Sequence, residues 1–273
     1  MPELPEVETT KRGIAPHIKG QIVTQIIVRQ AKLRWPIPDS IQQMCSQTVH
    51  SVQRRAKYLL LETSIGTALI HLGMSGSLRI VEIGTEVEKH DHIDIVFNNG
   101  KILRLRDPRR FGCVLWTLEA VAEHRLLQKL APEPLSDAFH ADYLYQQATK
   151  RRVSIKVFIM NAHYVVGVGN IYASEALFMA KIHPMQAAGT VSYQKIVRLV
   201  ECIKQVLSAA IEQGGTTLKD FANADGKSGY FQVKLQVYGK KGQDCSQCST
   251  TIKSVKLGQR ASFYCPSCQS SLK

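Results

Sequence analysis

Four cysteines near the end of the chain restrict what that end can fold into. Cys245, Cys248, Cys265 and Cys268 follow the pattern C-x2-C-x16-C-x2-C. Four thiolates at this spacing suit a tetrahedral zinc ion held between two turns, and a complete set of sulfur ligands leaves no position open for water or substrate. The sequence therefore predicts one structural zinc ion (Zn2+), which stabilises a module too small to bury a core of its own. Disulfides are the alternative, but the total of seven cysteines is odd and no secretion signal is evident.

The residues between the two cysteine pairs predict a hairpin. The stretch "IKSVKLGQRASFY" is rich in β-branched residues and turn formers. We expect two strands pinned by the zinc, with Arg260 near the tip. Lys253, Lys256 and Arg260 on such a rigid hairpin would suit binding to phosphate groups.

The charge balance indicates a polyanionic partner. Lysine plus arginine number 35 against 22 acidic residues, which gives a net charge of +13 and an isoelectric point near 9.5. The excess concentrates in the C-terminal tail and in "KILRLRDPRR" at 101–110, which favours nucleic acid over a merely well-solvated surface. No apolar run reaches the roughly 18 residues that span a bilayer. We therefore expect a cytoplasmic protein with no membrane partner.

Local sequence patterns predict the order of the secondary structure. Residues 3–18 predict a short helix with Pro5 in its first turn. Residues 21–116 predict several short strands, arranged as a sandwich or a barrel. Asn99 and Gly100 in this region mark a two-residue hairpin.

The second half of the chain has a different pattern of predicted secondary structure. The proline-rich stretch 131–137 reads as a linker, and the sequence over 138–213 is mainly helical. A glycine- and aspartate-rich loop follows. We expect an α+β multidomain protein whose domains span 1–131, 132–225 and 235–273.

A glycine turn between two predicted helices could bind phosphate. In "VVGVGNIYASEALF", Gly167 and Gly169 precede Asn170, which stands where the N-cap of a helix belongs. Exposed N–H groups at a helix start favour anions, and the basic residues upstream favour DNA. An ordinary helical hairpin is the alternative. The basic residues are Lys150, Arg151, Arg152 and Lys156.

Two predicted loops at strand ends carry apolar residues beside a cation. Met74 lies in "HLGMSG", and Arg109 and Phe111 lie in "RLRDPRRFGC". Apolar wedges beside a basic surface could fill the gap that an extruded base leaves in DNA. Spacing alone favours the other reading, in which Met74 and Phe111 are core residues.

The N-terminus has a possible chemical role. A small residue at position 2 permits removal of Met1, which would leave Pro2 with a free secondary amine. An α-amino group titrates near 8 rather than near lysine's value of about 10.4, so a fraction is neutral and can form an iminium. Glu3 would exchange protons beside it, and Lys57 would add a cation if folding brings it close. An ordinary helix start is the alternative.

Taken together, these stretches resemble the bacterial formamidopyrimidine-DNA glycosylases, which excise 8-oxoguanine. The resemblance rests on "PELPEVET", "RRAKYLL", "HLGMSG", "KHDH", "DPRRFG", "VVGVGNIYASEALF", "NADGKSGYF", "LQVYG" and "QRASFYCPSC", which extend over essentially the whole chain. It implies an N-terminal β-sandwich with a leading helix, a helical helix–two-turn–helix domain and a C-terminal zinc-finger β-hairpin. It also implies a monomer that holds double-stranded DNA with damaged purines in the cleft between its domains, in a bacterial cytoplasm and on the nucleoid.

The resemblance also implies a reaction and a role for each matching residue. The family removes oxidised purines (8-oxoguanine and formamidopyrimidines) in base excision repair and cleaves the strand as an AP lyase by β,δ-elimination. Pro2 is implied as the nucleophile at C1′, Glu3 as the acid/base, and Lys57 and Arg260 as the proton donors of the two eliminations. The implied DNA contacts are His90, Arg109, Arg151 and Asn170, with Met74, Arg109 and Phe111 filling the void and Lys219 in a loop at 217–230 that closes over the lesion.

Some residues depart from the family pattern, and two other functions stay open. Asn161 stands where an acidic residue is usual, and Ser249 stands where glycine is common, which bears on helix packing and on the geometry of the zinc turn. An endonuclease VIII-like glycosylase for oxidised pyrimidines would share Pro2 and the zinc, although Leu4 and "DPRRFG" favour the purine branch. A non-catalytic zinc-ribbon DNA-binding protein would explain the charge but leave Pro2, Glu3 and Lys57 without a role.

Overall fold

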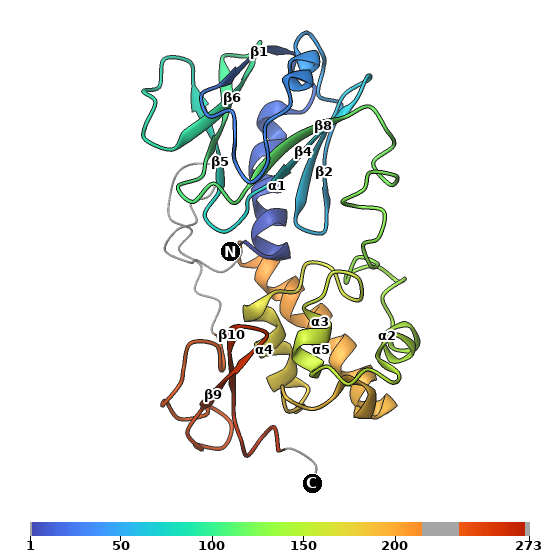
Figure 1. Ribbon diagram of the computed structural model, residues 1–273. Helices are drawn as coiled ribbons and strands as arrows, with labels where there is room; N and C mark the ends of the chain where they lie inside the picture. The colour runs from blue at the N-terminus through green and yellow to red at the C-terminus, as the bar shows by residue number, and fades with distance from the viewer. Residues whose placement is uncertain (1, 215–234, 271–273) are drawn as a thin grey trace. The chain divides into compact units, whose positions relative to one another are not determined.

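The computed structural model describes residues 2–214 and 235–270 (Figure 1). These residues form two compact units, one over 2–129 together with 213–214, and one that joins 130–212 to 235–270. Among the described helices, none is both long enough and apolar enough to cross a membrane.

The first unit is built around the leading helix, α1 (Leu4–Ile18). Glu3 is its N-cap, and Glu3 and Glu6 form a capping box in which each side chain accepts a hydrogen bond from the backbone N–H of the other. Pro5 lies in the first turn, where a missing N–H costs nothing. The helix contacts strands of both sheets of this unit, so its apolar face lies inside the core. The predicted helix is confirmed to within one residue.

Eight strands form two antiparallel four-stranded sheets, which confirms the predicted sandwich rather than a closed barrel. One sheet has the order β1-β6-β7-β5 and the other β2-β3-β4-β8. The strands are β1 (Val23–Val28), β2 (Ser51–Arg55), β3 (Tyr58–Glu62), β4 (Thr67–His71), β5 (Ser77–Glu82), β6 (Asp91–Phe97), β7 (Lys101–Arg106) and β8 (Cys113–Thr117), with a 3-10 turn, η1 (Asp39–Met44), after β1.

The predicted two-residue hairpin at Asn99 and Gly100 is wrong by one residue. Strand β6 ends at Phe97 and β7 begins at Lys101, so three residues connect them. Gly100 has φ 79° and donates its N–H to the Phe97 carbonyl at 3.2 Å. This is the turn that ends in a left-handed glycine, in which only the last residue needs positive φ.

The second unit consists of helices and one short hairpin. Its helices are α2 (Ala141–Ala148), α3 (Ile155–Ile159), α4 (Asn170–Met179) and α5 (Tyr193–Glu212), with a 3-10 turn, η2 (Ala188–Thr190). Strands β9 (Lys253–Leu257) and β10 (Arg260–Tyr264) form the hairpin. Helix α4 is buried on nearly every side because it packs against both α5 and β10. It is therefore apolar throughout most of its length, whereas α5 has the predicted amphipathic pattern.

One cation of the basic stretch at 101–110, Arg104, faces inward. The Arg104 side chain is 2% exposed and makes a double hydrogen bond to Asp94, from Nε to Oδ1 at 2.8 Å and from Nη2 to Oδ2 at 2.9 Å. Its Nη1 lies 3.6 Å from the carboxylate of Asp91. The pKa of Asp94 is lowered by its bonds to Arg104 and Arg29, although burial opposes the shift as the largest single effect. Arg104 is thus a structural residue, which corrects its assignment to a DNA-facing charge cluster.

We predict that Arg104→Met destabilises the first unit strongly, because the buried carboxylate of Asp94 loses its double hydrogen bond and keeps only Arg29, while Asp91 loses a nearby cation and keeps Arg79. The expected loss is about 3–5 kcal/mol of unfolding free energy, measured by urea denaturation. Lys101→Met is the matched control, since Lys101 pairs with the exposed Glu82 at the surface. Its expected loss is below about 1 kcal/mol. Equal losses for the two variants would contradict the prediction.

Candidate functional site

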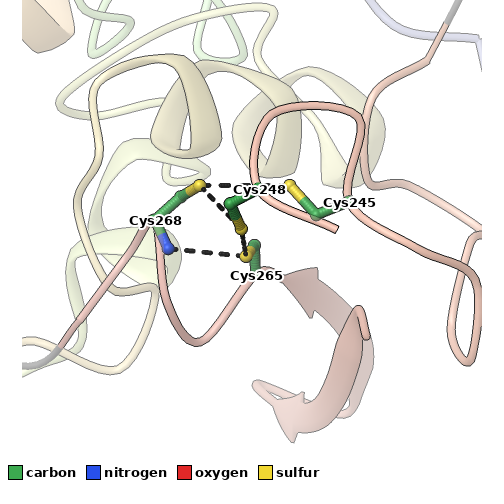
Figure 2. A group of neighbouring side chains, drawn as sticks. All are labelled: Cys245, Cys248, Cys265 and Cys268. Atoms are coloured by element: carbon green, nitrogen blue, oxygen red, sulfur yellow. Dashed lines mark hydrogen bonds between the residues drawn. The ribbon is translucent and has the colours of Figure 1, made fainter. Parts of the chain in front are cut away.

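The four cysteines of the C-terminal module form a ligand cluster. Their Sγ atoms all lie within 4.8 Å of one another, and Figure 2 shows the side chains converging from two turns. Cys248 Sγ lies 3.4 Å from Cys265 Sγ, and Cys245 Sγ lies 3.9 Å from Cys268 Sγ. Zinc–sulfur bonds of about 2.3 Å in a tetrahedron place the sulfurs about 3.8 Å apart. The donor set and its spacing therefore fit one zinc ion with four protein ligands.

The hairpin between the cysteine pairs presents Arg260 next to its tip, as predicted. Gly258 and Gln259 form the turn with φ 50° and 61°, which is the two-residue type that matches the twist of the strands. Arg260 is exposed and is the first residue of β10. A Cβ at Gly258 would lie 3.3 Å from the Val157 side chain, so the tip packs against α3.

Lys156 on α3 is a functional candidate whose predicted place is wrong. The sequence puts it among the DNA-facing cations, yet it is 1% exposed. Its Nζ donates to Asn170 Oδ1 at 2.6 Å, to Ser262 Oγ at 2.8 Å and to the Ala261 carbonyl at 3.3 Å. The ammonium therefore joins α3, the start of α4 and strand β10 through charge-assisted hydrogen bonds.

Asn170 is the first residue of α4, and the N-cap is Gly169, so the predicted N-cap is displaced by one residue. The reason is that the Asn170 side chain has other partners. Its Oδ1 accepts from Lys156, and its Nδ2 donates to the Ala261 carbonyl at 3.1 Å. Since Ala261 follows Arg260, the structure brings two predicted site residues, Asn170 and Arg260, to adjoining positions.

Arg151 lies in the connection before α3 and is exposed. Its guanidinium carbon lies 5.1 Å from the centre of the Tyr164 ring, and its Nε donates to the Gln147 carbonyl at 3.3 Å. A cation held against an aromatic face keeps its charge available to a second partner.

Glu175 is a buried residue that supports the candidate site and that the sequence reasoning missed. Its buried carboxylate accepts hydrogen bonds from three consecutive backbone N–H groups, those of Gln236, Val237 and Tyr238, at 2.7 to 3.0 Å. It thereby attaches the segment that leads into the zinc module to α4. An acidic residue inside the otherwise apolar "IYASEALF" helix was the signal that could have identified it.

At the head of α1, Pro2 and Glu3 are both buried. The capping box fixes the Glu3 backbone, because Glu6 Oε2 accepts from the Glu3 N–H at 2.8 Å. The capping box also fixes the Glu3 side chain, which accepts from the Glu6 N–H, so both buried residues have a defined place at the start of the helix. This arrangement can serve proton exchange at an amine as well as helix capping.

Lys57 is half-buried in the turn that connects β2 to β3. Its charge acts on His71, at the end of β4. The pKa of His71 is lowered from 6.5 to about 4, first by burial and then by the positive charges of Lys57 and Arg34. His71 Nδ1 accepts a hydrogen bond from the Gly73 N–H at 3.0 Å, which requires this nitrogen to be unprotonated. The neutral ring therefore anchors the turn that carries Met74.

Met74 and Phe111 lie outside the core, so the prediction from spacing alone is wrong for both. Met74 is 38% exposed and Phe111 is 45% exposed. The Arg109 guanidinium carbon lies 5.0 Å from the centre of the Phe111 ring, which brings these two predicted residues together. Met74 joins them through its neighbour, since the Arg109 N–H donates to Ser75 Oγ at 3.2 Å.

His90 is half-buried and has φ 77°, a conformation that few residues other than glycine adopt. Its carbonyl accepts a hydrogen bond from the Asp107 N–H at 3.1 Å. Lys219 and the predicted closing loop at 217–230 lie outside the described residues.

The two departures from the family pattern have different structural effects. Asn161 fits without strain, because its Oδ1 accepts from the His163 N–H at 3.0 Å and closes the turn after α3. Ser249 adopts φ 57° in the first cysteine turn. A side chain in this left-handed conformation is strained, which explains why glycine would suit the position.

Three family models match the chain in succession. The formamidopyrimidine-DNA glycosylase N-terminal domain matches residues 1–114, and the formamidopyrimidine-DNA glycosylase H2TH domain matches residues 130–222. The zinc finger found in FPG and IleRS matches residues 242–270, which include all four clustered cysteines. The cysteine cluster is therefore a structural zinc centre.

Curated relatives and solved structures match over almost the whole length. A formamidopyrimidine-DNA glycosylase of Photobacterium damsela subsp. piscicida is 59% identical over 98% of this chain and 100% of its own, and one of Shewanella woodyi is 56% identical over 98% and 99%. The crystal structure of the MutM (Fpg) protein from Thermus thermophilus is 32% identical, with a TM-score of 0.89 and full coverage of both chains. The Lactococcus lactis Fpg in complex with DNA containing an abasic site is 32% identical, with a TM-score of 0.90 over 98% of this chain and 100% of that chain.

We predict that acidification weakens the fold through His71. Its pKa in the folded chain is about 4, below the 6.5 of an ordinary histidine, so the unfolded chain binds the extra proton between these values. The unfolding free energy therefore falls as the pH drops from 6.5 to about 4. His71→Asn keeps an acceptor for Gly73 but cannot titrate. Urea denaturation across this range should show a smaller pH slope for the variant, and identical slopes would refute the prediction.

We predict that Ser249→Gly strengthens the zinc centre, because it removes the strained left-handed side chain. The expected gain is about 1 kcal/mol, seen as tighter zinc retention in competition with a chelator. Ser249→Ala is the control, since it keeps the Cβ at the same φ and should give no gain. A gain of equal size for Ser249→Ala would show that the strain is not the cause.

Proposed function

The chain belongs to the formamidopyrimidine-DNA glycosylase family, and we propose from this premise how its own residues perform the reaction. It is a bifunctional DNA glycosylase and AP lyase of base excision repair that removes oxidised purines. The observation that carries this assignment is the succession of matching domains over the whole chain, with relatives above 50% identity. Its partner in the proposal is duplex DNA that contains a damaged purine.

The reaction starts at Pro2 in this proposal. After removal of Met1, the neutral secondary amine attacks C1′ of the extruded nucleotide, and the bond from C1′ to the base breaks. The sugar ring opens as the amine and C1′ form an iminium. Glu3 exchanges protons at the sugar, and its support is the buried position beside Pro2 at the capped head of α1.

Strand cleavage follows by two eliminations from the covalent intermediate. The first breaks the bond to the 3′ phosphate and the second breaks the bond to the 5′ phosphate. Lys57 is the proposed proton donor of the first step, and Arg260 that of the second. Arg260 is suited to this role because it is exposed on the zinc hairpin, and its guanidinium can also hold phosphate. Zinc, when bound, supplies only rigidity to the hairpin through its four sulfur ligands.

Phosphate binding is proposed for residues of both units, each supported within its own unit. His90 and Arg109 are the candidates in the sandwich. Arg151 and Asn170 are the candidates in the helical unit, where Lys156 fixes the Asn170 side chain. Such contacts release counterions, so affinity should decrease with rising salt whichever lesion is present.

Met74, Arg109 and Phe111 are the proposed residues that fill the space of the extruded base. Their exposure supports this role, since each side chain is available outside the core. Lesion choice then comes from the lower cost of extruding a damaged base and from contacts in the pocket. We further propose that the protein acts as a monomer in the cytoplasm and associates with the nucleoid when bound to DNA.

We predict that borohydride traps the protein covalently on a duplex with 8-oxoguanine and that Pro2→Gly abolishes trapping. Blocking the amine by a short extension before Pro2 should abolish it as well, because the reactive nitrogen becomes an amide. The same extension placed at the C-terminus is the control and should leave trapping unchanged. A panel of oxidised purine and pyrimidine duplexes then tests the endonuclease VIII-like alternative.

Two outcomes would contradict this mechanism. One is normal trapping of the N-terminally extended protein. The other is a cross-link that peptide mass spectrometry assigns to a side chain other than Pro2.

A further inference from the structure

We infer that Asp107 is a positioning residue that holds two surface turns in one fixed arrangement. We call these the Met74 turn (residues 72–76) and the Arg109 turn (residues 107–112). The inference rests on the proposed function, in which Met74, Arg109 and Phe111 together fill the space of the extruded base. It adds a residue that touches neither DNA nor the reacting atoms.

The Asp107 carboxylate is bonded to both turns at once. The side chain is 0% exposed. Its Oδ1 accepts from Ser75 Oγ of the Met74 turn at 2.7 Å and from the Arg109 N–H at 3.3 Å. Its Oδ2 accepts from the Gly112 N–H at 2.8 Å. One buried carboxylate therefore accepts hydrogen bonds from both turns. We call the three side chains that these turns carry, Met74, Arg109 and Phe111, the wedge.

Ser75 closes the same network from the other turn. Its hydroxyl donates to Asp107 and accepts from the Arg109 N–H at 3.2 Å. Hydrogen bonds to an ionised acceptor are stronger than neutral ones, and the buried site increases this advantage. The carboxylate and the hydroxyl thus fix the backbone on either side of Arg109.

The backbone of Asp107 extends the arrangement to His90, the other phosphate-binding candidate of this unit. Its N–H donates to the His90 carbonyl at 3.1 Å. Its carbonyl is bonded to His92 Nε2 at 2.8 Å and accepts from the Arg110 N–H at 3.1 Å. The backbone of Asp107 is therefore bonded both to the turn at His90 and within the Arg109 turn.

The two turns also approach each other too closely to slide. Gly73 has φ 64°, and a Cβ there would lie 2.3 Å from the backbone carbon of Phe111. A Cβ at Gly112 would lie 2.7 Å from the His71 carbonyl and 3.0 Å from Asp107 Oδ2. Backbones in such contact can only move together, and Asp107 bonds them at the point of contact.

This anchoring matters because the ends of the wedge are exposed. Met74 and Phe111 are 38% and 45% exposed, so part of each apolar side chain is free to enter a base stack. A wedge enters a base stack with less loss of entropy if its backbone is already fixed. The buried Asp107 carboxylate fixes the backbone of the two turns that carry the wedge.

The test compares two activities of Asp107→Asn. Asparagine has the same shape but a single acceptor oxygen, so at least one of Ser75, Arg109 and Gly112 faces an NH2 group instead of an acceptor. We expect single-turnover excision of 8-oxoguanine from a duplex to fall by about tenfold or more, as the loss of a bond to a charged group predicts. Cleavage of a preformed abasic site, which has no base to extrude, should fall much less. The readout is the rate of 8-oxoguanine excision divided by the rate of abasic-site cleavage.

Asp94→Asn is the matched control, because it also alters a buried carboxylate of the sandwich but one bonded to Arg104 and Arg29. It should lower the unfolding midpoint and leave the ratio of the two rates unchanged. If Asp107→Asn behaves in the same way, Asp107 is merely structural and the inference is wrong. If Asp107→Asn does not fold, Ser75→Ala decides, since it should lower the ratio in the same direction, and an unchanged ratio overturns the inference.

Met74→Ala and Phe111→Ala separate this inference from the proposed function. If neither variant lowers the ratio, the wedge proposal itself is wrong, and the role of Asp107 falls with it. If both lower the ratio while Asp107→Asn and Ser75→Ala do not, the wedge stands and only the positioning role is refuted.

Discussion

The ammonium of Lys156 connects the parts of the second unit on which its proposed DNA contacts depend. Zinc gives the hairpin its shape, but the shape alone does not place Arg260. Lys156 bonds Asn170 on α4 and two groups of β10, and Glu175 on the same helix holds the segment that enters the module. Both charges are buried and engaged with backbone, amide or hydroxyl groups. The module is therefore attached to the helices by ionic hydrogen bonds as well as by the apolar cluster that includes Phe178 of α4, Val237 and Ile252.

The same principle operates in the sandwich, where buried ions organise loops. Arg104 links two carboxylates and donates to the carbonyls of Thr85 and Glu86 in the loop before β6, while Asp107 fixes two turns that are separated by three strands in the chain. Charged residues that look alike in the sequence thus have opposite uses. Arg109 faces outward and is available to a ligand, whereas Arg104 serves the fold. The net charge of +13 therefore does not show which of the cations DNA could meet.

Features governed by local rules were predictable from the sequence, and those governed by distant partners were not. The head of α1 follows from Pro5 and the capping box, and the zinc centre follows from cysteine spacing alone. Asn170 was misplaced as an N-cap because its side chain bonds to Lys156 and Ala261, the latter 91 positions away. The sequence around Lys156 is typical of a surface cation, because its buried partner Ser262 lies 106 positions away in the chain. The exposure of Met74 and Phe111 depends on which turns meet at Gly73, and hydrophobic spacing carries no information on that.

The burial of α1 gives the N-terminal end an uncommon mechanical property. Chain ends usually fray independently of the rest of a domain. Here the helix that follows Glu3 contacts both sheets and contributes to the main core, so its first turn cannot unwind without opening that core. The conformational freedom of this end is removed when the sandwich folds, long before any substrate arrives. If Pro2 supplies the amine as proposed, the folding of the sandwich itself places that amine.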